Sequence, residues 1–287
     1  MPFFVSVVVL GCIYSVLAAG FVVIYKSSRV LNFSYTSVAV MLAYLTISVM
    51  RHVPGPPVVA VIIVLAFSFF LGLVIYRFFI RPMAGQPIFS IIILTVALGI
   101  VVDAITILIW HCETENLFLG WRAYYSVFGM AQISGVEILI ILTAIVFYTG
   151  ILLFYKHSKT GWQMRASAEN VLLAAQRGIN IYSITGLSWG IGILATGMAA
   201  ILLGANSSVS PQMGHIAVKA FAVALVAGLD SMPGCIPAAF IVALAELAAN
   251  TYVNPRLADA MPFMIMLVVL VARPWGLMGT EEEIERV

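Results

Sequence analysis

The chain has 287 residues, of which 63% are hydrophobic and only 9% are charged, and its formal net charge is +2. Soluble domains carry about 25% charged residues, so this composition excludes a soluble globular protein and indicates an integral membrane protein. Nearly every position belongs to an apolar run or a short loop, which leaves no room for a soluble catalytic domain. The basic residues lie at the ends of the runs, where they indicate orientation and not nucleic-acid binding.

The first apolar run, 3–25, has no basic residue before it and is followed by Lys26 and Arg29, the reverse of a signal peptide. It predicts a spanning helix that enters from the outer side. The next run, 37–50, would be only about 21 Å long as a helix, which is shorter than the hydrocarbon core of about 30 Å. This length indicates a tilted or broken element.

Between these two runs, polar side chains interrupt hydrophobic sequence without a Gly or Pro turn. Polar groups at membrane depth persist only where they face protein or a water-filled cavity. The segment is therefore either an ordinary loop at the interface or a discontinuous helix that lines a translocation path. The candidate pathway residues are Asn32, Phe33, Ser34 and Tyr35.

Seven further apolar runs follow, and the charges at their ends set their direction. Arg77 and Arg81 close the first of them on the cytoplasmic side, and acidic and aromatic residues after the second mark the outer side. Each of the two runs that flank 230–233 is a short span or one arm of a re-entrant hairpin. The seven runs cover residues 58–76, 88–110, 136–155, 181–204, 216–229, 234–250 and 261–272.

These runs predict an all-α polytopic helical bundle, a single domain over 1–287 with about eight or nine spanning or half-spanning segments. The N-terminus is expected outside the cell, and the C-terminus with its acidic tail, 280–287, in the cytoplasm. Five glycines in 181–204 predict close helix contacts there.

The longest hydrophilic interval, 156–180, carries four basic residues against Glu169, which predicts a cytoplasmic location. Written as one helix, it places Ala168 and Leu172 on an apolar face opposite Ser167. The interval is either a solvated linker between two spans or a docking helix for a soluble partner.

Two acidic residues interrupt apolar sequence and are functional candidates, because an ionisable group in lipid is costly. Asp103 lies near the middle of its run, where it serves the pathway or forms a structural hydrogen bond to a neighbouring helix. Asp230 begins the break that includes Ser231 and Pro233, and it either belongs to the pathway or caps a half-helix.

Other ionisable residues lie closer to the ends of the runs. Glu137 and Glu246 are expected at the membrane interface, and Lys219 is expected to extend outward to water. The three cysteines and four histidines are dispersed, so neither a metal site nor a disulfide is predicted. The chain has no P-loop, and therefore it does not bind ATP in that way.

Several stretches together resemble the permease subunits of bacterial ATP-binding cassette (ABC) importers for branched-chain amino acids, a family that includes urea and short-chain amide importers. The resemblance extends over nearly the whole chain and includes 11–20, 30–33, 81–87, 231–234 and 273–279. Its most specific part lies where the family places its ATPase-coupling segment, at Thr160, Gly161, Arg165, Ala166, Asn170, Ala174 and Gly178.

The resemblance implies a transport subunit that is not itself an enzyme and has no cofactor of its own. It implies a second permease, two cytoplasmic ATPases that hold ATP and Mg²⁺, and an extracytoplasmic substrate-binding protein, all at the bacterial inner membrane. The substrate would be a branched-chain amino acid or a related small amino acid or amide. The sequence departs from the family pattern at 34–36 and at Asp230. The alternative is a stand-alone secondary transporter or channel that uses Asp103 and Asp230.

Overall fold

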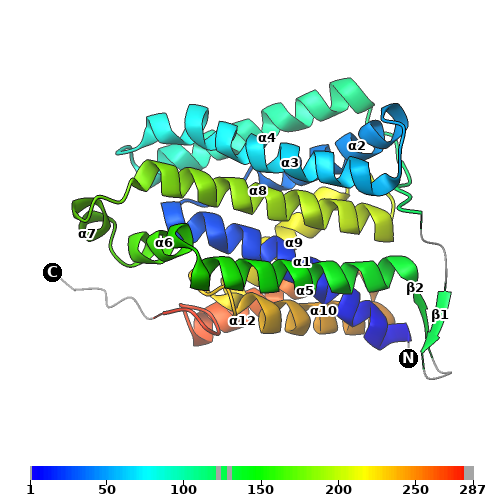
Figure 1. Ribbon diagram of the computed structural model, residues 1–287. Helices are drawn as coiled ribbons and strands as arrows, with labels where there is room; N and C mark the ends of the chain where they lie inside the picture. Colours follow the sequence, from blue (N-terminus) through cyan, green and yellow to red (C-terminus); the bar gives the residue numbers. More distant parts are fainter. Residues whose placement is uncertain (1, 121–123, 128–130, 281–287) are drawn as a thin grey trace.

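The computed structural model describes residues 2–120, 124–127 and 131–280, and these residues form a bundle of helices that lie roughly along one axis (Figure 1). β1 (Tyr124–Val127) pairs with β2 (Ala131–Ser134) in an antiparallel hairpin with Tyr124 opposite Ser134. The helices are α1 (Pro2–Ser28), α2 (Tyr35–His52), α3 (Pro57–Ile75), α4 (Ile88–Trp110), α5 (Gly135–His157), α6 (Lys159–Glu169), α7 (Val171–Gln176), α8 (Ile181–Asn206), α9 (Met213–Ala227), α10 (Cys235–Tyr252), α11 (Pro255–Ala258) and α12 (Met261–Ala272).

Six of the described helices are long and apolar enough to cross a membrane, and α9 and α12 are shorter apolar helices. The six are α1, α3 with its continuation to Met83, α4, α5, α8 and α10. The continuation of α3 is a π turn, η1 (Tyr76–Ile80), and a 3₁₀ turn, η2 (Arg81–Met83). The prediction of an all-α polytopic bundle is confirmed.

α1 and α8 form the centre of the bundle (Figure 1), and most of their side chains are buried. The glycines of α8 allow the close contacts that the sequence predicts. A Cβ added to Gly72 of α3 would lie 2.4 Å from the carbonyl oxygen of Trp189, and one added to Gly20 of α1 would lie 2.9 Å from that of Gly192. Small residues thus let the backbones of α1 and α3 approach α8, which is how helices associate tightly in lipid.

The chain between α1 and α2 is not helical, and its polar groups are paired inside the protein. Arg29 adopts a left-handed backbone conformation, with φ of 53°, directly after α1. The backbone N–H of Phe33 donates to Thr95 Oγ1 of α4 at 3.2 Å, and that of Ser34 donates to Asn32 Oδ1 at 3.1 Å. The predicted interruption is therefore present, and α2 begins beside α4 and not at the end of the bundle.

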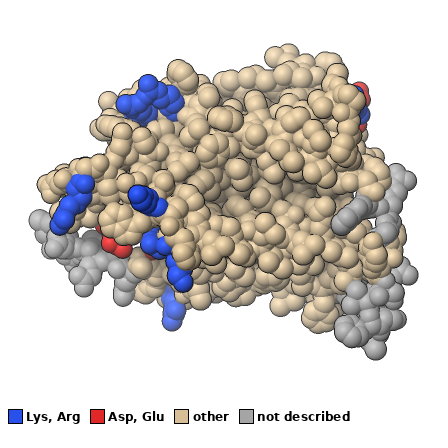
Figure 2. Space-filling model, viewed as in Figure 1, with Lys and Arg blue, Asp and Glu red and all other residues tan. Residues whose placement is uncertain are grey.

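Basic side chains gather at the end of the bundle that carries α6 and α7, while the middle of the same face shows no charge (Figure 2). Lys26, Arg29 and Arg165 line one cavity at this end, together with Met278 and Thr280 from the segment after α12. The first turns of α1 lie at the opposite end, beside the β hairpin (Figure 1). The described ends of the chain therefore lie at opposite ends of the bundle.

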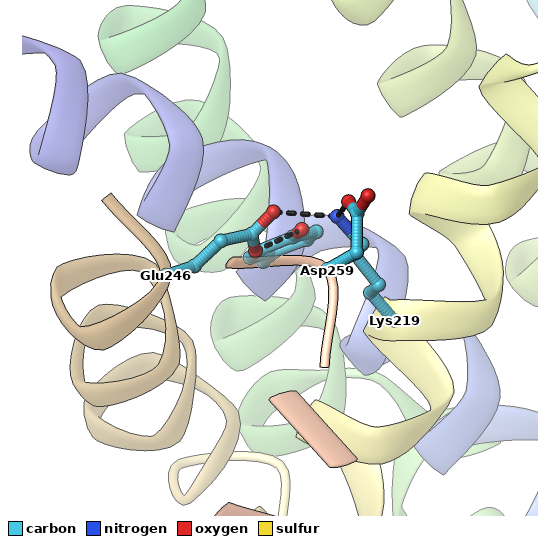
Figure 3. A network of polar contacts seen from close by, with 4 residues as sticks. Lys219, Glu246 and Asp259 are labelled. Carbon is cyan, nitrogen blue, oxygen red and sulfur yellow. Dashed lines mark hydrogen bonds and ion pairs between the residues drawn. The ribbon is translucent and has the colours of Figure 1, made fainter. Parts of the chain in front are cut away.

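A partly buried ionic network connects α9, α10 and the turn before α12 (Figure 3). Lys219 Nζ lies 2.6 Å from Glu246 Oε1 and 2.8 Å from Asp259 Oδ1, and Tyr14 of α1 donates to Glu246 Oε2 at 2.7 Å. The Lys219 ammonium donates a hydrogen bond to Asp259, and this bond and its positive charge hold the pKa of that carboxyl below its usual range.

The expectation that Lys219 extends outward to water is wrong, and Glu246 is buried within the protein beside it. Lys219 is 7% exposed and Glu246 is 9% exposed. Each charge is tolerated because the other neutralises it and hydrogen bonds satisfy the remaining atoms. Glu137 lies at a helix end, where its Oε2 accepts from the backbone N–H of Ser134 at 2.7 Å in a capping box.

We expect Lys219→Met to lower the free energy of unfolding by about 3–5 kcal/mol, because it leaves the Glu246 carboxylate buried without a counter-charge. The measurement is the melting temperature of the purified protein in detergent. Asp259→Asn is the control, since it removes only the exposed partner and should change the melting temperature little. The double variant Lys219→Met/Glu246→Leu should recover much of the loss. A wild-type melting temperature for Lys219→Met would show that the network does not stabilise the fold.

Candidate functional site

The hydrophilic interval at the basic end forms two short helices and not one amphipathic helix. α6 ends at Glu169, and Asn170 begins α7 by accepting a hydrogen bond from the backbone N–H of Leu173 at 2.9 Å. This break changes the helical phase, so the predicted faces are wrong: Ser167 is buried and Leu172 is exposed. The asparagine side chain is a standard helix N-cap, and it causes the break.

α6 is fixed against the end of α5. Ser158 Oγ accepts from the backbone N–H of Gly161 at 2.8 Å, which starts the helix. A Cβ added to Gly161 would lie 2.3 Å from the carbonyl oxygen of Phe154, so only glycine fits at this contact. Met164 packs with Ala174 and nearby residues of α8 in a small separate core. The segment is therefore a built structural element, which argues against a simple linker.

α6 and α7 expose four large apolar side chains, which we call the apolar knob. Exposed large apolar side chains on short helices at one end of the bundle are typical of a protein contact site. The knob consists of Trp162, Val171, Leu172 and Leu173, each more than half exposed.

The predicted coupling residues divide into those that build the segment and those that face outward. Gly161 and Ala174 are buried, whereas Asn170 and Gly178 are exposed. Gly178 has φ of 81°, a conformation that glycine adopts without strain, and it turns the chain from α7 toward α8. The remaining three, Thr160, Arg165 and Ala166, are partly exposed.

Asp230 lies at the basic end and not within the apolar middle of the bundle. With Arg165 and Glu169 of α6 it lines a cavity of about 560 Å³. Its carboxylate accepts hydrogen bonds from the backbone N–H and the hydroxyl of Thr280. No side chain caps the start of α10, whose N-cap residue is Gly234, so the suggestion that Asp230 caps a half-helix is wrong. Ser231 Oγ accepts from the backbone N–H of Gly234 at 3.2 Å in the turn before the helix. Pro233 lines the same cavity.

Asp103 lines a second cavity, a groove of about 450 Å³ between α2, α4 and the start of α9. The groove extends from Cys112 and Pro211, at the end opposite α6, to Thr36 in the first turn of α2. Asp103 is exposed, and the residues that the structure describes give it no hydrogen bond or ion pair. The alternative, in which Asp103 forms a structural hydrogen bond to a neighbouring helix, therefore finds no donor among the described residues.

A narrow aromatic pocket of about 40 Å³ adjoins the groove at Thr36, which lines both. Its wall includes Phe21, Phe33 and Phe221. Asn32 also lines it and is 1% exposed, with Oδ1 accepting from Ser34 while Nδ2 has no partner among the described residues. An unpaired buried donor costs about 1–3 kcal/mol, so this amide is unusual within a packed bundle.

The two interruptions of hydrophobic sequence lie at separate cavities. Asn32 and Phe33 line the aromatic pocket, and Asp230 to Pro233 line the cavity at the basic end, with no residue in common. Tyr35 is fully buried and donates to the carbonyl oxygen of Leu17 at 2.8 Å, so its hydroxyl is held by α1. Sequence reasoning missed Phe21 and Phe221, because an aromatic residue in an apolar helix carries no distinctive signal.

Residues 186–190 match the G-x-S-x-G pattern of serine hydrolases. Ser188, however, lies fully buried in the middle of α8, and its hydroxyl donates to the carbonyl oxygen of Ile184 at 3.1 Å. That pattern requires a turn between strand and helix that exposes the serine. The match therefore reflects the small residues of α8 and indicates no catalytic nucleophile.

Sequence comparisons agree with the geometry over nearly the whole chain. The profile of the family described as "branched-chain amino acid transport system / permease component" matches residues 3–270. The high-affinity branched-chain amino acid transport system permease proteins BraD of Pseudomonas aeruginosa and LivH of Escherichia coli K12 are each 26% identical to this chain. The alignments cover 96% of this chain and 94% of BraD, and 98% of this chain and 95% of LivH. A probable LivH of Methanocaldococcus jannaschii is 22% identical over 92% of this chain and 88% of its own length.

Gly161→Ala should loosen α6, because the new methyl group collides with backbone atoms of α5 that have no flexible side chain to move aside. Overpacking of this kind costs about 1–3 kcal/mol, so we expect backbone amides of α6 to exchange with deuterium about tenfold faster. The matched control is Gly150→Ala in α5, where the added methyl group would meet no atom within 4 Å. Equal exchange in the two variants would contradict the tight contact.

Proposed function

Because the chain belongs to the family of permease components of branched-chain amino acid transport systems, we propose that it imports a branched-chain amino acid, or a related small amino acid or amide, as the membrane subunit of an ATP-driven ABC importer. The chain is a multi-pass membrane protein and a transport subunit, not an enzyme. The proposal places it in the bacterial inner membrane.

The apolar knob on α6 and α7 is the observation that carries this proposal. It lies on α6 and α7, at the basic end of the bundle, and presents exposed leucine and tryptophan side chains. Apolar anchors within a polar surround are the usual centre of a protein interface. A cytoplasmic ATPase with an apolar groove would bind here.

The proposed importer has three further kinds of subunit: ATPases, a second permease and an extracytoplasmic binding protein. ATP and Mg²⁺ would be held by two ATPase subunits, since this chain has no P-loop. A second permease, identical or paralogous, would cover the outward face of α2 and α4 and complete the groove beside Asp103. An extracytoplasmic binding protein would deliver substrate at the end of the bundle that carries the β hairpin.

Transport would follow alternating access driven by the ATPases. Closure of the ATPase pair would displace α6, and the tight contact between Gly161 and Phe154 would transmit that displacement to α5. A ligand shifts an equilibrium between two states only through different contacts in each. The ATPase would make different contacts with the apolar knob in the two states, and the loaded binding protein would make different contacts with the opposite end.

A stand-alone secondary transporter that uses Asp103 and Asp230 is less well supported. Such proton or ion relays need acidic groups along one path. Asp103 and Asp230 line separate cavities, and the Asp230 carboxylate is engaged by Thr280.

The gathering of basic side chains around α6 supports a cytoplasmic location for this end, with the N-terminus outside and the C-terminus inside. In a Cys112→Ser background, which removes the partly exposed native thiol at the opposite end, we expect a cysteine introduced at the exposed residue Gln176 of α7 to react with a membrane-impermeant maleimide only in inverted membrane vesicles. Labelling in intact cells would reverse the assignment.

Reconstitution tests the function directly. Proteoliposomes that contain this chain, its partner permease, the ATPases and the binding protein should accumulate leucine on addition of ATP. The variant Leu172→Ser/Leu173→Ser should lower the affinity for the ATPase by about tenfold or more, because it removes two interface anchors, and uptake should fall with it. Gln176→Ala, an exposed residue of the same helix, is the control and should leave uptake unchanged.

The same preparation distinguishes the alternative. Liposomes with this chain alone should show no ATP-dependent uptake. Concentrative uptake by the chain alone, driven by an ion gradient, would favour the secondary transporter.

A further inference from the structure

The chain that follows α4 forms a short connection at the end of the bundle opposite α6. His111 and Cys112 end the helix in left-handed backbone conformations, with φ of 55° and 56°. Two such residues in succession are strained, and the strain persists only where the surrounding contacts hold the turn. We call residues 111–117 the strap. Its last residue, Leu117, is buried and lies against Gly204 of α8.

Contacts on two sides hold the strap. The backbone N–H of Glu115 donates to the carbonyl oxygen of Val209 at 2.9 Å, and the N–H of Val209 donates to that of Glu115 at 2.7 Å. On the other side, Arg51 Nη2 of α2 lies 2.6 Å from Glu115 Oε2. Tyr44 of α2 also donates to the carbonyl oxygen of Glu113 at 2.8 Å. The strap therefore joins the end of α2 to the segment that precedes α9.

These contacts lie at one end of the groove that contains Asp103. Cys112 of the strap lines the groove, as does Pro211, two residues after Val209. The groove continues between α2 and α4 to Thr36, beside the break. The strap thus holds two walls of the groove together, α2 and the start of α9, at the end opposite α6. A solute that enters the groove from this end would pass the strap.

The ion pair is the contact that is most easily exchanged. The side chain of Arg51 is 61% exposed and that of Glu115 is 27% exposed, and exposed pairs are screened by water and salt. Both charges are accessible to a docking protein, which could replace the internal pair with pairs of its own. The strained turn at His111 and Cys112 also opposes the closed form.

We propose that the strap is the gate at the outer end of the translocation pathway. The gate is closed when Glu115 binds Arg51 and Val209. It opens when the substrate-binding protein takes over the two charges and the strap leaves α2. This inference rests on the proposed function, and it assigns the moving element at the end opposite the ATPase site. A partner shifts an equilibrium only through contacts that differ between the states, and Arg51 and Glu115 provide such contacts.

The backbone bridge offers a way to lock this gate. Residues that exchange both hydrogen bonds in an antiparallel pair have Cα atoms about 5.5 Å apart, which lies within the range of a disulfide. In a Cys112→Ser background, the double variant Glu115→Cys/Val209→Cys should therefore form a disulfide on oxidation. In proteoliposomes of the complete importer, we expect oxidation to abolish ATP-driven leucine uptake and dithiothreitol to restore it.

The single variants Glu115→Cys and Val209→Cys in the same background are the controls, and oxidation should leave their uptake unchanged. Undiminished uptake after the disulfide has formed, as verified by mass spectrometry, would overturn the gate, because transport would then proceed with the strap fixed. Failure of the proposed function is distinguishable, since a chain that imports no leucine shows no uptake before oxidation either.

Labelling of Cys112 tests the gate without transport. This thiol is partly exposed in the groove, whereas Cys12 and Cys235 are buried. In the complete importer in lipid nanodiscs without ATP, Arg51→Gln should raise the rate at which a maleimide labels Cys112 about two- to fivefold, as expected for the loss of an exposed ion pair. The charge-swapped variant Arg51→Glu/Glu115→Arg should bring the rate back toward that of the wild type.

The matched control is Arg256→Gln, which removes an exposed basic side chain of α11 that does not contact the strap, and it should leave the labelling rate unchanged. Equal rates in the wild type and in Arg51→Gln would overturn the assignment of the ion pair to the gate. A rise in the charge-swapped variant as large as that in Arg51→Gln would overturn it as well.

Discussion

The structure depends on one constraint, which is that a backbone N–H or C=O group inside a membrane must find its partner within the protein. Helices satisfy this requirement by themselves, and the chain between Arg29 and Ser34 does not. The N–H groups of Phe33 and Ser34 are satisfied by Thr95 of α4 and by the side chain of Asn32. Because α4 supplies one of these partners, it is held beside the start of α2.

This pairing shapes what lies around the break. Gly99 of α4 faces Ser34 and Ser37, and an added Cβ would come within 3.3 Å of each. One turn further along α4, Asp103 borders the groove. The same amide that satisfies Ser34 through its oxygen leaves its nitrogen unused. The polar features of the groove and pocket thus arise from the way in which the break is stabilised.

The spans could be predicted because long apolar runs have few alternatives in lipid, and the interruption at 29–34 could be predicted because polar residues rarely enter such runs. The pairing of Lys219 with Glu246 could not, since it joins two helices across a turn and depends on their rotation about their own axes. The place of Phe221 in the aromatic pocket could not be predicted either, because it depends on the rotation of α9 about its axis. The division of α6 from α7 could have been predicted, because Asn170 is a strong N-cap residue. The prediction of one continuous helix across Asn170 overlooked this signal.

α9 connects the ionic network and the aromatic pocket with the cavity at the basic end. Its last turn and the turn that follows it are joined to the end of the chain, through the bonds from Leu277 and Met278 to α9 carbonyl groups and from Thr280 to Asp230. Its middle carries Lys219 in the ionic network and Phe221 in the aromatic pocket. A helix of this length is a stiff rod of about 22 Å. Asp230, in the turn after α9, lines the same cavity as residues of α6. A displacement of α6 that moved this turn would therefore also move Phe221, because a rigid helix transmits the displacement along its length.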